Sequence, residues 1–195
     1  MWINVSEGVR VAVGTFESCY SLTNITISDG VTTIGDRAFS DCSSLTNITI
    51  PNSVITLGFQ AFAFCSSLTS VYFSCNAPSL GDSVFYVYGT TEVTVYYLAG
   101  TAGWGATFGD RPTAYWHLPY PAILSFGPNF GVQTNRFGFI FSWATNIPVV
   151  VEASTTLVNP IWSPVGTNTL TDGSSYFIDP AWTNYPSRFY RVRSP

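Results

Sequence analysis

The 195-residue chain contains no lysine and few charged side chains of either sign. Its 7 basic residues are all arginine and face 11 acidic residues, which gives a formal net charge of -4 at pH 7. This balance argues against nucleic acid and anionic membranes as partners, because both are bound by clusters of basic side chains. The chain also lacks the run of about 18 apolar residues that a membrane-spanning helix needs, so such a helix is excluded.

Motifs that mark catalysis, a metal or a cofactor are also missing. The one histidine is His117, and no Cys-x-x-Cys, His-Glu-x-x-His or Gly-x-Ser-x-Gly motif occurs. A hydrolytic triad would need His117 beside a serine and a carboxylate, yet most acidic residues fall on predicted turns or variable positions. We therefore predict that the protein is not an enzyme and has no catalytic, cofactor-binding or metal-binding residue. An uncharacterised hydrolase is kept as a remote alternative.

A phrase with a period of 23 residues recurs along the first half of the chain. Leu22-Thr23-Asn24-Ile25-Thr26-Ile27 returns as Leu45-Thr46-Asn47-Ile48-Thr49-Ile50 and, with changes, as Leu68-Thr69-Ser70-Val71-Tyr72-Phe73. A fixed period in the twenties predicts a solenoid. Within each phrase the alternating pattern predicts a short strand, with leucine and isoleucine turned inward and threonine and asparagine outward.

The remainder of each repeat connects one predicted strand to the next. The segment Asp36–Cys42 is too short for an independent helix and is predicted to form one or two helical turns on the convex side. One repeat buries too little apolar surface to offset the entropy of ordering it, so neighbouring repeats must stack. A shortened repeat over residues 3–19 and a last strand at 93–97 bring the predicted array to roughly four rungs.

The repeated phrase Leu-Thr-Asn-Ile-Thr-Ile-Pro-Asn-Ser-Val, followed by Leu-Gly, Ala-Phe and Cys-Ser-Ser-Leu, resembles the BspA-like class of bacterial leucine-rich repeats. The resemblance covers residues 3 to about 97, and residues 97–105 resemble the segment that closes such arrays. It implies a surface or secreted protein that binds host or matrix molecules, and it implies no catalytic residue. The shortened first repeat departs from the pattern, as does Ser28, which stands where the next repeat has Pro51.

Three of the four cysteines follow the repeat. Cys19, Cys42 and Cys65 are 23 residues apart and are expected to form a column. The simpler interpretation is a set of small buried side chains at one repeat position. The alternative is a disulfide between adjacent rungs, which the rung spacing allows but the parallel side-chain vectors disfavour. Cys75 lies outside the column and is a candidate free thiol, so the redox state of all four stays open.

The second half has no repeat and consists of short apolar or alternating runs separated by Gly-Pro, Asn-Pro, Asp-Gly and Asp-Pro turns. The runs cover residues 122–126, 137–143, 149–153, 162–165, 174–178 and 188–193. They predict a small antiparallel β-sandwich of Ig-like or jelly-roll type. The predicted domains are therefore 1–118, the repeat domain with its closing segment, and 119–195, the sandwich.

The same half resembles a small C-terminal sandwich module that recurs at the ends of secreted repeat proteins of environmental bacteria. The resemblance rests on residues 149–154, 162–167 and 188–193. It spans nearly the whole half and implies no catalytic activity.

Three groups of side chains in this half admit two interpretations each. Flat aromatic rings suit a sugar-stacking platform or, as the favoured alternative, core and turn packing; they are Trp143, Trp162, Trp182 and Tyr185. Arginines near the C terminus suit an acidic partner or a solvated sheet face; they are Arg188, Arg191 and Arg193. Three acidic residues, Glu152, Asp172 and Asp179, carry the carboxylates that calcium prefers, but their spacing matches no calcium-binding loop. Turn formation explains Asp172 and Asp179.

The repeat strands supply the first candidate contact surface, an uncharged row of hydroxyl and amide groups suited to a protein or polysaccharide. Its residues are Thr23, Asn24, Thr26, Thr46, Asn47, Thr49, Thr69 and Tyr72. The second candidate is the N-terminal rung with Trp2, Ile3 and Val5, where no polar cap precedes the apolar side chains. Such an open end favours head-to-tail contacts between copies, which close into a ring or continue as a filament.

We therefore predict a non-catalytic extracellular protein-interaction or structural module that assembles head to tail into a fibre or surface matrix. A monomeric adhesin or carbohydrate-binding module is the alternative. The expected partners are a protein or polysaccharide surface or further copies of the chain, with no cofactor, nucleic acid or membrane insertion. Met1-Trp2-Ile3 starts without a basic region or an apolar signal core. Extracellular or cell-surface localisation therefore rests on the resemblance, and the chain is a candidate fragment of a longer protein.

Overall fold

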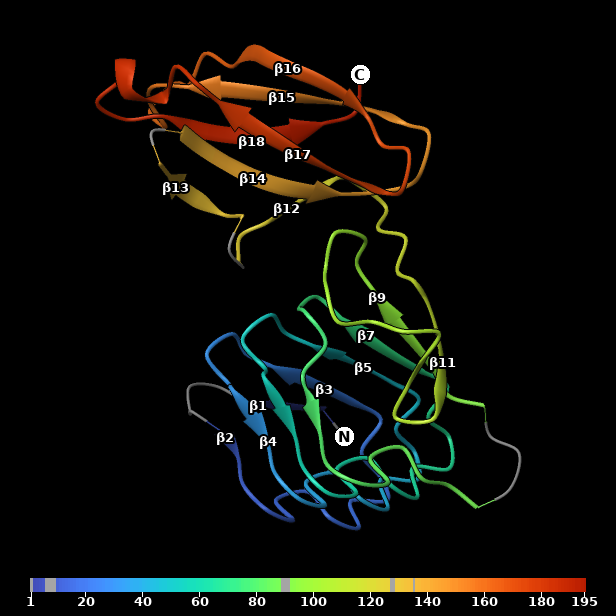
Figure 1. Ribbon diagram of the computed structural model, residues 1–195. Helices are drawn as coiled ribbons and strands as arrows, with labels where there is room; N and C mark the ends of the chain where they lie inside the picture. Colours follow the sequence, from blue (N-terminus) through green and yellow to red (C-terminus); the bar gives the residue numbers. More distant parts are fainter. Residues whose placement is uncertain (1, 6–9, 89–91, 127–128, 135) are drawn as a thin grey trace. The chain divides into compact units, whose positions relative to one another are not determined.

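The computed structural model describes residues 2–5, 10–88, 92–126, 129–134 and 136–195 and consists almost wholly of strands and turns (Figure 1). Within these residues, a 3-10 turn at Trp182–Asn184 is the one helical segment, and no helix has the length and apolar character to cross a membrane. The predicted mainly β fold is thus confirmed. The chain separates into two compact units, residues 1–97 with 101–116, and residues 98–100 with 117–195. That 1–118 and 119–195 form separate domains stays a prediction.

Parallel strands at the repeat period form one side of the first unit (Figure 1). They are β1 (Trp2–Val5), β3 (Asn24–Ile27), β5 (Asn47–Ile50), β7 (Ser70–Phe73) and β9 (Thr94–Tyr97). β1 pairs with β3, and β5, β7 and β9 pair in order. β11 (Arg111–Tyr115) adds in parallel to β9, and β10 (Thr107–Phe108) adds antiparallel to β11. Each of the five repeat strands overlaps a segment that the sequence predicted, although the array was counted as roughly four rungs.

A second row of very short strands runs through the array and was not predicted. It consists of β2 (Arg10–Val11), β4 (Thr33–Ile34), β6 (Thr56–Leu57) and β8 (Ser79–Leu80). These strands pair in parallel in that order. Two residues are too few for alternation to mark a strand, which is why the sequence pattern does not show this row.

The convex segments are turns, so the prediction of short helical turns is wrong. Arg37 and Asp41 have φ angles of 52° and 60°, in the left-handed region that a right-handed helix excludes. Arg37 N donates to Phe59 O of the next repeat at 2.8 Å, whereas Ala38 N donates back to Gly35 O at 3.2 Å. Every second N–H group of this turn therefore donates to a carbonyl of the next repeat. The regular hydrogen bonds of an α-helix, which stay within one segment, cannot form.

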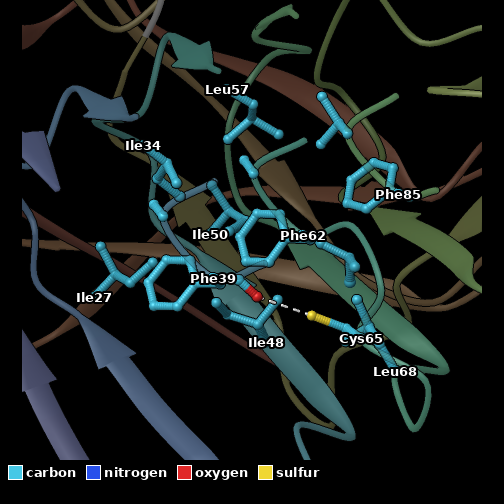
Figure 2. Close-up of a cluster of buried hydrophobic side chains, with 14 of the residues drawn as sticks. Ile27, Ile34, Phe39, Ile48, Ile50, Leu57, Phe62, Cys65, Leu68 and Phe85 are labelled. Carbon is cyan, nitrogen blue, oxygen red and sulfur yellow. Dashed lines mark hydrogen bonds between the residues drawn. The ribbon is translucent and has the colours of Figure 1, made fainter. Parts of the chain in front are cut away.

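The core of the first unit repeats with the rungs (Figure 2). Phe39 and Phe62 have no exposed surface, and their ring centroids lie 5.2 Å apart with planes 5° apart. Phe16 and Phe85 extend this stack on either side. Leucine and isoleucine of the phrase over residues 45–50 are buried and its threonines are exposed, which confirms the predicted alternation.

The cysteines, all within the described residues, are free thiols, and Cys42, Cys65 and Cys75 are buried. The Cys65 thiol donates to Phe39 O at 3.1 Å (Figure 2), and the Cys42 thiol donates to Phe16 O at 3.2 Å. Each sulfur thus fills a small space in the core and is bonded to the backbone of the preceding repeat. This arrangement supports the interpretation as buried side chains over the disulfide.

We expect a thiol reagent at about pH 8 to modify at most Cys19 in the native protein, because Cys42, Cys65 and Cys75 are buried and the reagent cannot reach them. Burial raises the pKa of Cys75 to about 12. The pKa of Cys65 is also raised, by its hydrogen bond with the Cys42 thiol and then by burial. Both thiols therefore stay protonated at this pH. Mass spectrometry should count all 4 thiols only after denaturation, and rapid modification of two or more in the native state would contradict the buried column.

The second unit contains two antiparallel sheets. In one, β14 (Arg136–Ser142) pairs with β12 (Ala122–Leu124), β13 (Gly131–Gln133) and β17 (Ser174–Asp179). In the other, β15 (Pro148–Ser154) lies between β16 (Ser163–Thr169) and β18 (Phe189–Arg193). Each predicted run overlaps a strand, and β13 was missed. The sheets share a core that includes Phe139, Phe141 and Phe177 from one and Val149 and Val151 from the other.

Candidate interaction surface

The outward side chains of the repeat strands line up from one strand to the next. Thr49 lies opposite Tyr72 in the β5–β7 ladder, and Tyr72 lies opposite Tyr96 in the β7–β9 ladder. Each of these residues alternates with a buried neighbour of its strand, as Thr49 does with Ile48. We call the outward positions the strand face. Its described members are Thr23, Asn24, Thr26, Thr46, Asn47, Thr49, Thr69, Ser70, Tyr72, Thr94 and Tyr96.

Hydrogen bonds order the polar part of the strand face. Asn47 Nδ2 donates to Thr46 Oγ1 at 3.1 Å, and Asn24 makes the same bond to Thr23 at 3.4 Å. The Thr69 hydroxyl donates to Thr46 O at 3.3 Å and so connects two repeats. None of the members is charged. The face therefore offers hydroxyl and amide groups that are partly held in place before a partner arrives.

The predicted residues do not all fall on one continuous ladder. Asn24 and Thr26 lie on β3, which lies beside β5 but belongs to a different sheet. Trp2 lies opposite Asn24 in the β1–β3 ladder, and Ile3 and Val5 are on the same strand. The side chains of Trp2, Ile3 and Val5 fall outside the described part of the structure, so the N-terminal rung as a contact surface stays a prediction.

An aromatic group ends the strand face and was largely missed from the sequence. The rings of Tyr72 and Tyr96 have centroids 5.0 Å apart and planes 19° apart, and Trp116 lies 5.1 Å from Tyr72. Tyr96 occupies the repeat position of Tyr72, so the period contained this signal. Trp116 follows β11 outside the repeat and is held by a bond from its N–H to Tyr97 O at 2.7 Å; periodicity could not identify it.

A second aromatic group lies on the turn side of the same unit. Phe64 lies 5.6 Å from Tyr86 and 5.3 Å from Tyr88, between ring centroids. Tyr86 is 43% and Tyr88 77% exposed. These rings sit in turns near the end of the array, where no sequence pattern marked them.

The four candidate aromatic residues of the second unit do not gather into a sugar-stacking platform. Trp143 packs against the core, and no ring contact joins any two of the four within the described residues. The guanidinium of Arg191 lies 4.6 Å from the Trp162 ring, and that of Arg188 lies 4.1 Å from the Tyr185 ring. Two of the rings are thus occupied by arginines on one face.

The C-terminal arginines are paired within the chain. Arg191 Nε donates to Glu152 Oε2 at 2.7 Å, and Arg193 Nε donates to Glu152 Oε1 at 2.9 Å. Hydrogen bonds from Arg193 and Arg191 lower the pKa of Glu152. Arg188 forms an ion pair of 2.7 Å with Asp179. The charge available to an acidic partner is therefore smaller than three arginines suggest.

The geometry supports neither a metal-binding site nor a catalytic site at His117. Among the described residues, no group of three or more histidine, cysteine, aspartate and glutamate side chains is placed to hold a metal ion. His117 is exposed.

Comparison with known proteins identifies the repeats. Residues 6–99 match the family model described as BspA type leucine-rich repeat region, in 6 copies. This match and the parallel stacking define a solenoid of leucine-rich-repeat type and confirm the resemblance for these residues. Repeats of this family generally lack catalysis, typically mediate protein binding and typically occur in surface or secreted proteins. Searches of curated proteins and of solved structures found no match.

Proposed function

We propose that the protein is a non-catalytic extracellular module that holds a partner protein on its strand face, with Tyr72, Tyr96 and Trp116 as the main contacts. The observation that carries this proposal is the aromatic group at one end of an ordered, uncharged polar row. Protein interfaces are enriched in tyrosine and tryptophan and depleted of charge at their centre, and such aromatic residues carry much of the binding energy.

The order of the strand face supports the same conclusion. The Asn47 amide is bonded to Thr46, and the Tyr72 ring contacts the rings of Tyr96 and Trp116. Side chains that are fixed before binding lose less conformational entropy when a partner arrives. A hydroxyl-and-amide face also costs less to desolvate than a charged one. Both properties favour a specific contact that is made through uncharged hydroxyl and amide groups.

An extracellular setting and a sandwich fold for the second unit belong to the same proposal. The match to a family typical of surface or secreted proteins supports the setting. The core shared by β14 and β17 with β15 supports the sandwich, because facing sheets pack through their inward side chains. The second unit would then act as a compact attachment that follows the repeats.

Thr49→Lys tests the strand face at its centre. We expect the substitution to weaken partner binding about tenfold or more, because a charge must then be desolvated on an uncharged surface. Biolayer interferometry against a panel of purified matrix proteins and polysaccharides provides the measurement. Thr15→Lys is the matched control, because Thr15 is equally an exposed threonine of this unit but lies in the turn after β2 and not on the strand face.

Three results of this experiment would count against the proposal. Equal loss in both lysine variants would remove the assignment to the strand face. Binding to polysaccharides alone would favour the carbohydrate-binding alternative. Growth of large species in sedimentation of the unmodified protein, without any partner, would favour head-to-tail self-assembly, which stays a prediction.

A further inference from the structure

The second unit contains a cavity of about 310 Å³ that the proposed function does not use. It is formed where the end of β15, the start of β16 and the segment before β18 meet, with Thr155, Ile161, Ser163 and Tyr185 among its lining residues. Its volume is near the lower end of the range of about 300–1,000 Å³ for small-molecule sites. A site of this size suits one ring rather than a stretch of polymer.

Arg188 is the one charged residue among the described residues that line the cavity. Its side chain is 12% exposed, and its Nε lies 2.7 Å from Asp179 Oδ2. The alignment there is not that of a hydrogen bond, and this buried Nε has no hydrogen-bond partner within the described residues. The guanidinium also lies 4.1 Å from the Tyr185 ring. Arg188 is therefore held rigidly at the wall of the cavity, and a ligand there would use the N–H donors of its two terminal nitrogens, because the Nε is buried beside Asp179.

The carboxylate of Asp179 is occupied within the protein and does not line the cavity. Its Oδ1 accepts the Ala181 N–H at 2.9 Å, and its Oδ2 accepts the Tyr190 hydroxyl at 2.8 Å. Asp179 thus holds Arg188 in place from behind. Among the described residues the cavity is therefore lined by a guanidinium and by no carboxylate, although Asp179 offsets part of that charge from outside the lining.

The rest of the lining indicates which anion fits. Thr155 and Ser163 contribute hydroxyl groups, whereas the Ser154 hydroxyl is bonded to Thr156 O, and Ile161 and Val165 contribute apolar walls. No acidic residue is among the described residues that line the cavity, so the ammonium group of an amino acid would find no partner. Hydroxyl groups, an aromatic ring and one arginine match a ligand with several hydroxyls, an apolar ring face and one carboxylate.

We propose that this cavity binds a single acidic sugar of the uronic acid class, with its carboxylate on Arg188 and its ring between Tyr185 and the apolar wall. The site is independent of the strand face, and each proposal stands if the other fails. The arginine contributes a charge-assisted contact that a neutral sugar cannot make. The surrounding hydroxyl groups contribute contacts that a simple carboxylate cannot make.

Calorimetric titration of the full chain with glucuronate, glucose and acetate tests the proposal. We expect glucuronate to bind about tenfold or more tightly than either of the other two, since hydrogen bonds to charged groups are the stronger ones. Ser163→Trp fills the cavity and should abolish glucuronate binding. Thr167→Trp is the matched control, because Thr167 is an exposed residue of the same strand but does not line the cavity. Arg188→Lys keeps the charge beside Asp179 and should weaken glucuronate binding without unfolding.

Each other outcome overturns the proposal. If glucose bound as tightly as glucuronate, Arg188 would not contribute to binding. If acetate bound as tightly as glucuronate, the cavity would be a general anion site with no preference for a sugar. Binding that survives Ser163→Trp would place the sugar elsewhere, and an absence of binding at millimolar glucuronate would refute the site. If Ser163→Trp fails to fold, amide chemical shifts of the unmodified protein decide. Shifts must then change at residues 153–165 and 185–188 on addition of glucuronate.

Discussion

Phe62→Ala is expected to destabilise the repeat unit by about 3–5 kcal/mol, the range for phenylalanine truncation in a closed core. Phe62 has no exposed surface, and its ring lies 5.2 Å from that of Phe39 and 5.9 Å from that of Phe85. Truncation removes one layer from the phenylalanine stack, and the layers on either side are held at the rung spacing and cannot close the gap. Urea denaturation followed by circular dichroism measures the free energy of unfolding.

Phe59→Ala is the matched control for this loss. Phe59 lies three positions earlier in the same repeat and is 39% exposed, with the Arg37 guanidinium 5.7 Å from its ring. An exposed contact of this kind contributes about 0.5–1 kcal/mol. Similar losses for both variants would show that the phenylalanine stack does not carry the stability of the unit.

Gly58→Ala is the second large effect, with an expected loss of about 3 kcal/mol from overpacking. A Cβ at Gly58 would lie 2.5 Å from Asp36 N and 2.7 Å from Gly35 C. Both atoms belong to the backbone of the preceding repeat, so neither can move without separating two rungs. The same close approach recurs at Gly81, where a Cβ would lie 2.5 Å from Phe59 N. The thermal midpoint and the unfolding free energy both report this loss.

Gly105→Ala separates the steric effect from the general effect of replacing glycine. The nearest atom to a Cβ there is Thr107 O at 3.4 Å, which is ordinary contact. Reduced entropy of the unfolded chain then makes the change neutral or stabilising by up to about 1 kcal/mol. If Gly58→Ala lowered the free energy of unfolding no more than Gly105→Ala does, the account of a tight backbone contact between rungs would be wrong.

The repeat explains why so much of the first unit was predictable. The alternation over Leu45–Ile50 depends only on which side chains face the core. A strand with one buried face has apolar residues at its inward positions and polar residues at its outward positions, so the sequence shows the pattern. The convex turn at Asp36–Cys42 was predicted wrongly because its backbone bonds go to the neighbouring repeat. A pattern within one repeat cannot reveal which N–H groups another repeat will satisfy.

The candidate sites show the same limit. Thr46, Thr49 and Tyr72 were placed on one face because period and alternation fix both the strand and the side. Trp116 joins them only through the path of the closing segment after β11, which has no periodic signal. The cavity at Arg188 brings together segments 153–165 and 185–188, and no spacing rule in a sequence without repeats connects them.

Hydroxyl-radical footprinting tests the central claim, that the partner lies on the strand face, most directly. The two aromatic groups of the repeat unit, one with Tyr72, Tyr96 and Trp116 and one with Phe64, Tyr86 and Tyr88, act as internal reporters for two different surfaces. With the bound partner identified by interferometry present, we predict reduced oxidation of the first group and unchanged oxidation of the second. Protection of the second group alone would contradict the account.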